Sequence, residues 1–214
     1  MKKLLTLALF ISAFLISTNV YSQSLGLGIE AGINIANTNN TPSINSSTRT
    51  GFLVGGVVDI GFTPTIGITT GMRYIMKGNK FPATTNTGVT GEATGKLSYL
   101  EFPVLLKVRF PLTEVKPYLI GGPTLGLKLA SEIEFVGGGT TFTQDVSAST
   151  ESIDFGLFFG GGIDFKIAPK VDLFIQAGYG LGLSNIEKTV NQATTPSTTK
   201  TTGIQITGGA KFRL

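Results

Sequence analysis

The chain has 214 residues, with 17 basic and 13 acidic side chains, 29 glycines, and no Cys, His or Trp. Its formal net charge of +4 is too small for a nucleic-acid-binding surface, and the lack of Cys excludes a lipoprotein, disulfides and thiolate metal sites. Only 14% of the residues are charged, against about 25% in ordinary soluble domains, so something other than water should surround much of the surface.

The first segment, residues 1–22, has the pattern of a secretion signal. Lys2 and Lys3 precede an apolar run from Leu4 to Ile16, and Val20-Tyr21-Ser22 ends in the small residue that signal peptidase requires. We therefore predict cleavage after Ser22 and a mature chain, residues 23–214, that forms a single domain. A retained transmembrane anchor is the weaker alternative, because the apolar run is shorter than the about 20 residues that span a bilayer.

Eight later segments alternate large apolar residues with Gly, polar or charged residues. In Ser24 to Ala36, every odd position from Leu25 to Ile35 is apolar, and every even position is small or polar. Side chains of a strand point to opposite faces with period two, so this pattern predicts a strand with one apolar face. The other segments are 51–62, 66–77, 99–110, 115–129, 154–167, 171–183 and 204–214.

The connections between these segments alternate in length. Tight turns are expected at 62–65, 111–114 and 168–170, and long connections rich in Asn, Thr, Ser and Gly at 37–49, 78–95, 130–152 and 184–200. Outer-membrane barrels have short periplasmic turns, long external loops and usually at least eight strands. The sequence therefore predicts an all-β fold: an eight-stranded antiparallel transmembrane β-barrel in the bacterial outer membrane, with both termini in the periplasm.

A soluble barrel of the lipocalin type also alternates, with its apolar face turned inward. The segments here run about 10 to 14 residues, which matches tilted transmembrane strands better than the about 5 to 6 residues of soluble ones. Gly crowds the polar face, which suits a narrow packed lumen. Aromatic residues on the apolar face also form two groups, like interfacial girdles. They are Phe62, Phe110, Phe165 and Phe212 on the predicted periplasmic side, and Phe52, Tyr74, Phe155 and Tyr179 on the other.

Charged residues on the predicted inner face include acids and bases in similar number. We favour an ion-pair network that fills the lumen over a selectivity filter, because an eight-stranded barrel is just wide enough to be filled by its own side chains. If the hairpin around 78–95 is symmetric, Arg73 lies opposite Glu101. The inner-face residues are Glu30, Asp59, Arg73, Glu101, Lys107, Arg109, Asp164, Lys166, Asp172, Lys211 and Arg213.

No catalytic, metal or cofactor site is predicted. Outer-membrane proteases and acyltransferases rely on a His, with Asp or Ser, that activates a nucleophile or water, and this chain has no His. A glycosidase-like carboxylate pair is disfavoured because the candidate acids lie in or beside a long loop, where we expect them to be solvated. These acids are Glu132, Glu134, Glu151 and Asp154.

Two runs of three glycines could suggest phosphate-binding loops, but neither precedes a predicted helix. The run at 137–139 is expected to turn an extended hairpin, with Ile133 and Phe135 on one arm and Phe142 on the other. The run at 160–162 lies inside a predicted strand. Both runs are therefore interpreted as structural.

Two neighbouring segments resemble a known family. Residues 99–107 read Tyr-Leu-Glu-Phe-Pro-Val-Leu-Leu-Lys and residues 116–123 read Lys-Pro-Tyr-Leu-Ile-Gly-Gly-Pro, similar to signatures of the PorT-like outer-membrane β-barrel family of the Bacteroidetes. Residues 180–186 are similar to its seventh strand. The chain departs from the family in lacking an Arg before Tyr179 and in ending on Leu214 rather than an aromatic residue. The resemblance implies the barrel and the outer membrane, and for a few members a role in the secretion system that exports gliding and adhesion proteins.

Two functional hypotheses remain for a barrel surrounded by outer-membrane lipid. In the first, it is a structural or interaction platform whose external loops contact an envelope protein or a surface glycan, with an accessory role in protein secretion as one form. Function often resides on loops held by a rigid scaffold. In the second, it is a channel or transporter that passes a small solute through a narrow charged lumen.

Overall fold

The computed structural model describes residues 24–41, 45–110, 112, 115–188 and 198–214. The predicted signal segment 1–22 lies outside these residues, as do parts of the connections 37–49, 111–114 and 184–200. No helix among the described residues is long and apolar enough to cross a membrane.

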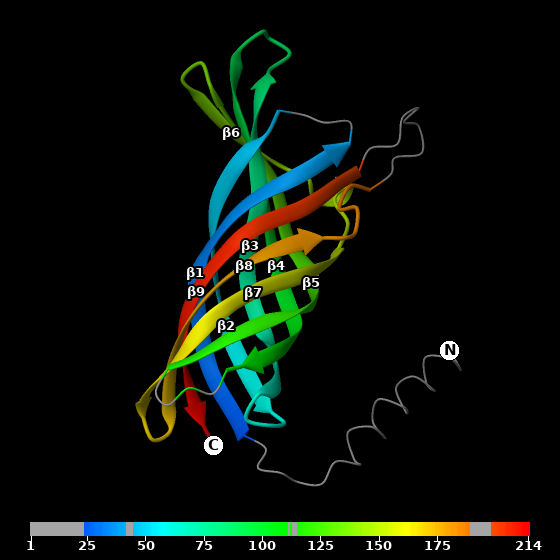
Figure 1. Cartoon of the computed structure of the whole chain (residues 1–214). Helices are drawn as coiled ribbons and strands as arrows, with labels where there is room; N and C mark the ends of the chain where they lie inside the picture. The colour runs from blue at the N-terminus through cyan, green and yellow to red at the C-terminus, as the bar shows by residue number, and fades with distance from the viewer. Residues whose placement is uncertain (1–23, 42–44, 111, 113–114, 189–197) are drawn as a thin grey trace, which may run out of the picture.

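The described residues form nine strands and one short 3-10 helix, η1, at Ser147–Ser149. The strands are β1 Ser24–Thr41, β2 Ser47–Gly61, β3 Ile66–Thr84, β4 Thr90–Arg109, β5 Val115–Gly137, β6 Thr140–Asp145, β7 Ile153–Ala168, β8 Val171–Gly182 and β9 Thr198–Arg213. All neighbouring strands are antiparallel. The order β4-β3-β2-β1-β9-β8-β7-β5 closes through the pairing of β4 with β5, and β6 is attached to β5 outside this ring (Figure 1). The predicted eight-stranded antiparallel barrel is confirmed.

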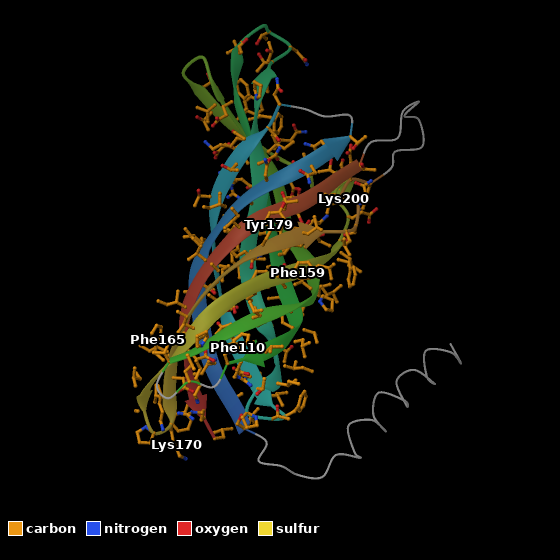
Figure 2. All side chains as sticks on the ribbon, in the orientation of Figure 1. Phe110, Phe159, Phe165, Lys170, Tyr179 and Lys200 are labelled. Atoms are coloured by element: carbon orange, nitrogen blue, oxygen red, sulfur yellow. The ribbon has the colours of Figure 1, made fainter. Side chains whose placement is uncertain are left out.

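The exposure of the side chains follows the predicted alternation. In β1, Ile29 is 71% exposed, whereas Asn34 is almost completely buried. In β4, Val104 and Leu106 are about half exposed, whereas Leu105 between them is buried. Figure 2 shows Phe110 and Phe165 near the end of the barrel that carries the short turns, and Phe159 and Tyr179 further toward the other end. The outside of the ring is therefore an apolar belt of the kind that faces lipid.

At the end that carries the long connections, the strands run further than the sequence pattern predicts. Residues 78–95 were expected to be a loop, but the register that pairs Arg73 with Glu101 continues as far as Thr84 opposite Thr90. Likewise β1 pairs with β9 as far as Thr41 opposite Thr198. Asn, Thr, Ser and Gly are typical of loops, but here their backbone groups extend ladders that the apolar segments have already set in register.

Strand β5 changes its partner where it leaves the ring. It pairs with β7 as far as Leu127, and with β6 from Glu132 onward. Between these stretches its register with β4 shifts by one residue, which leaves Leu129 as a β-bulge. The predicted hairpin around residues 137–139 is confirmed, because Phe135 lies opposite Phe142 and Gly138 and Gly139 have positive φ angles of 58° and 76°.

Candidate functional site

Ten of the eleven charges expected on the inner face form ion pairs inside the barrel or at its rim. Together with Lys77 and Asp154, they form two clusters along the barrel and one rim pair. The loop-end cluster comprises Glu30, Arg73, Lys77, Glu101 and Asp154. The turn-end cluster comprises Asp59, Lys107, Arg109, Asp164 and Lys211. The rim pair joins Arg213 to Asp172, with Nε and Oδ2 2.9 Å apart.

Arg73 is the centre of the loop-end cluster. It lies opposite Glu101 in the register of β3 and β4, as the symmetric hairpin predicts. Its Nε and Nη2 donate to Oε1 of Glu101 at 2.9 and 2.5 Å, and Nη2 also donates to Gln205 at 2.9 Å. Nη1 lies 3.6 Å from the carboxylate of Glu30. Four strands, β1, β3, β4 and β9, therefore meet at one guanidinium.

Lys77 and Asp154 belong to the same cluster, although neither is among the charges predicted for the inner face. The ammonium of Lys77 lies 3.0 Å from Glu101 and 3.0 Å from Asp154. Asp154 also accepts hydrogen bonds from Thr201 at 2.8 Å and Ser184 at 3.1 Å. The expectation that Asp154 is solvated is wrong, because β7 begins one residue before it and the strand alternation points its side chain inward. Lys77 has the inward parity of Arg73, which was the available signal.

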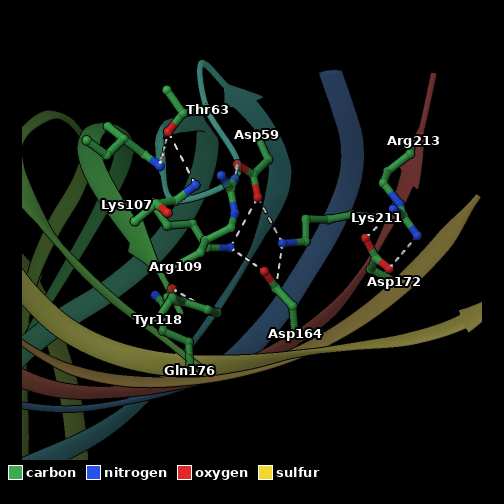
Figure 3. Close-up of polar contacts among 12 residues, drawn as sticks. Asp59, Thr63, Lys107, Arg109, Tyr118, Asp164, Asp172, Gln176, Lys211 and Arg213 are labelled. Atoms are coloured by element: carbon green, nitrogen blue, oxygen red, sulfur yellow. Dashed lines mark hydrogen bonds and ion pairs between the residues drawn. The ribbon is translucent and has the colours of Figure 1, made fainter. Parts of the chain in front are cut away.

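The turn-end cluster is built around a square of alternating charges, shown in Figure 3. Lys107 lies 3.1 Å from Asp59 and 2.8 Å from Asp164, and Lys211 lies 2.9 Å and 2.7 Å from the same two carboxylates. Arg109 adds a third cation to Asp59. The five side chains come from four strands, β2, β4, β7 and β9. The cluster therefore links strands that are far apart in the sequence.

Lys166 is the exception among the predicted inner-face charges. It is exposed and forms no ion pair with a described residue. The strand alternation gives it inward parity, but it lies at the end of β7, where the register with β8 shifts between Lys166 and Ala168. At that height the chain has left the enclosed part of the barrel, so the side chain reaches solvent.

Four buried cations of the two clusters also lie against an aromatic ring. The Nζ of Lys107 is 3.7 Å from the centre of the Tyr118 ring. The others are Lys77 over Tyr99 at 5.3 Å, Lys211 over Phe174 at 5.0 Å, and Arg73 over Phe158 at 5.7 Å. These contacts add a cation–π attraction to the ion pairs, and the rings occupy the space between the clusters.

Two cavities beside the charge clusters are small. One enclosed cavity of about 10 Å³ borders Asn34 and Glu101, and another of about 20 Å³ borders Thr69 and Tyr118. A cavity needs about 10 to 15 Å³ to hold one water molecule. These two cavities therefore have room for little more than single waters.

Comparison with known proteins places the chain in a family. Residues 21–188 match the family model of the outer membrane protein beta-barrel domain. Three solved structures are similar to it at low identity. Neisserial surface protein A is 15% identical with a TM-score of 0.48, covering 91% of this chain and 100% of that chain. Ail, the attachment invasion locus protein of Yersinia pestis, in complex with the heparin analogue sucrose octasulfate, is 14% identical with a TM-score of 0.41, covering 89% and 99%.

The third is the outer membrane protein OprG from Pseudomonas aeruginosa, 11% identical with a TM-score of 0.44, covering 90% of this chain and 95% of that chain. No curated protein matches the sequence. The family match extends over more than three quarters of the chain and includes the strands that carry both charge clusters except for β9. The chain belongs to the outer membrane protein beta-barrel domain family.

Proposed function

We propose that the protein is a closed platform in the outer membrane, which holds a rigid strand extension outside the cell for contact with another envelope protein or a surface glycan. The observation that carries this proposal is the extension itself, formed by residues 78–84 of β3, 90–96 of β4, 130–137 of β5 and all of β6 (Figure 1). Its ladders run as far as Thr84 opposite Thr90 and Gly137 opposite Thr140. A surface ordered before binding loses less conformational entropy when a partner docks.

The extension offers several features that a partner could recognise. Phe142 and Val136 are about half exposed on it, and the Phe142 ring stacks on Phe135 with centroids 5.2 Å apart. A groove of about 830 Å³ lies between β2, β3, β4 and β5 on this part of the barrel. The outer edge of β6 pairs with no other described strand, so its backbone is available for a strand from another chain.

A photo-cross-linking residue at Phe142 should test the platform in native outer membranes. We expect Phe142 substituted by p-benzoylphenylalanine to give protein or glycan adducts on mass spectrometry. The matched control is the same substitution at Phe159, which is equally exposed but lies on the apolar belt and should give lipid adducts. The same adducts from both positions would contradict the proposal.

The finer assignment to the PorT-like family is part of this proposal, and its supporting residues lie on the adjacent strands β4 and β5. A role in secretion would be one form of the interaction function. In that case the adducts at Phe142 would contain a component of the secretion machinery. Adducts with an unrelated envelope protein would support the platform without the secretion role.

The alternative function, a small-solute channel, predicts a measurable current. The two clusters and their rings fill the lumen, so we expect no steady conductance above background when the purified barrel is inserted in a planar bilayer. The control is a known porin in the same bilayer. Reproducible single-channel steps from the wild-type protein would favour the channel over the closed platform.

The orientation of the barrel is also proposed, with the short turns and both termini in the periplasm. An epitope tag inserted at Thr87, in the turn between β3 and β4, should be labelled by antibody on intact cells. A tag after Leu214 should be labelled only after the outer membrane is permeabilised. The reverse pattern would mean that the extension faces the periplasm.

A further inference from the structure

A chamber of about 430 Å³ opens at the turn end of the barrel. Its wall comes from all ring strands except β3, together with the turn between β2 and β3, and four residues of the turn-end cluster line it: Asp59, Arg109, Asp164 and Lys211. Small-ligand pockets measure about 300 to 1,000 Å³. Unlike the cavities deeper in the barrel, this chamber therefore has room for a small molecule.

The carboxylates that border the chamber are already engaged. Asp59 accepts hydrogen bonds from both lysines of the square through Oδ2, and from Arg109 through Oδ1. Asp164 accepts one through each oxygen, from Lys211 and Lys107. Asp172 is occupied by Arg213. A cation entering the chamber would have to displace one of these bound side chains.

The cations, in contrast, have donors to spare. A guanidinium carries five N–H groups, and Asp59 is the only described side chain or backbone group that accepts from the guanidinium of Arg109. The ammonium of Lys116 forms no hydrogen bond or ion pair with any described residue, although it lines the chamber. Four cationic and three anionic side chains line the chamber, so its formal charge is positive.

We propose that this chamber binds a small phosphate-bearing anion, held by the guanidinium of Arg109 and the ammonium of Lys116. A phosphate presents several acceptor oxygens, which the planar fork of an Arg and the point charge of a Lys can share. The chamber opens to the aqueous side of the turn end, so the phosphate can come from a free solute or from the headgroup of an anionic lipid.

Titration calorimetry with glycerol 1-phosphate, on the barrel in maltoside micelles, tests the site. Lys116→Gln should weaken binding about tenfold, the change expected from the loss of one charge-assisted hydrogen bond. Lys116→Arg should retain most of the affinity. The matched control is Lys166→Gln, which removes the same charge from an exposed position outside the chamber and should leave the affinity unchanged. Compact mobility of unheated samples on a detergent gel shows that each variant is folded.

Phosphatidylglycerol added to the micelles distinguishes the two sources. If the headgroup reaches the chamber, the lipid should lower the apparent affinity of wild-type protein for glycerol 1-phosphate. If it does not, the affinity is unchanged and the ligand is a free solute. The proposal is overturned if wild-type protein binds no glycerol 1-phosphate in lipid-free micelles, or if Lys116→Gln and Lys166→Gln weaken binding equally.

Discussion

Arg73→Met should destabilise the barrel by about 3 to 5 kcal/mol, the usual cost of leaving a buried charge without its partner. The loop-end cluster contains two cations and three carboxylates, so removing Arg73 leaves one lysine among three acids. Glu101→Gln leaves two cations and two carboxylates and should cost less. Urea unfolding of barrels refolded in lipid vesicles, followed by tyrosine emission, measures both changes.

The double variant, Arg73→Met with Glu101→Gln, provides the control for this prediction. Because the two side chains share a direct contact, its cost should fall short of the sum of the single changes by about 0.5 to 3 kcal/mol. Glu30 and Lys77 keep the coupling from being complete, since each also contacts one member of the pair. Additive costs, or a larger cost for Glu101→Gln than for Arg73→Met, would show that the cluster is not held as described.

Leu106→Arg should destabilise the barrel by about 2 to 4 kcal/mol, as expected for a charge on the lipid face near the middle of the bilayer. Leu106 is half exposed on the apolar belt of β4, opposite Ile68 of β3 and Gly121 of β5. Lipid cannot solvate a guanidinium there, so the folded state loses stability while the unfolded state in urea does not.

Val136→Arg is the matched control, because Val136 is also an aliphatic residue on a strand and is half exposed. It lies in the extension of β5, where we propose that water rather than lipid surrounds the strand. The same urea titration should show a change within about 0.5 kcal/mol, as for most surface substitutions. Equal costs at the two positions would mean either that the belt is not the lipid face or that the membrane reaches the extension.

The sequence predicts the ring well because alternation and register reinforce each other. Once the lipid face of two adjacent segments is known, the connection between them fixes which residues lie opposite each other. The pairing of Arg73 with Glu101 follows directly. A shift by one residue would turn a whole apolar face into the lumen, so few registers are available to each hairpin.

The extension and part of the candidate site could not be read from the sequence in the same way. The Thr- and Asn-rich stretches beyond the belt have no apolar alternation, and they form strands only because their neighbours continue the ladder. The prediction that Asp154 is solvated is wrong because this residue stands next to such a stretch. The prediction that Lys166 lies on the inner face is wrong because alternation gives the direction of a side chain but not its height in the barrel. The chamber depends on side chains from seven strands, and only closure of the ring brings these together.

The family-like signature of residues 99–107 has a plain structural meaning in this barrel. Its inward residues Tyr99, Glu101, Leu105 and Lys107 are all buried. Glu101 and Lys107 belong to one cluster each, and Tyr99 supplies a ring for Lys77. The motif therefore reflects how side chains fill the lumen. It does not determine what the strand extension contacts.

The seam between β1 and β9 has a consequence for the order in which the chain folds. Every other seam of the ring joins strands that are close in sequence, whereas Gly26 lies opposite Arg213. Contacts between distant residues carry the largest loop-closure entropy and form slowly. Until that seam closes, Lys211 cannot reach Asp59, and the square lacks the ion pair that joins them. The ion pair between Lys211 and Asp59 therefore forms together with closure of the ring, and until then Asp59 has only Lys107 and Arg109 as partners.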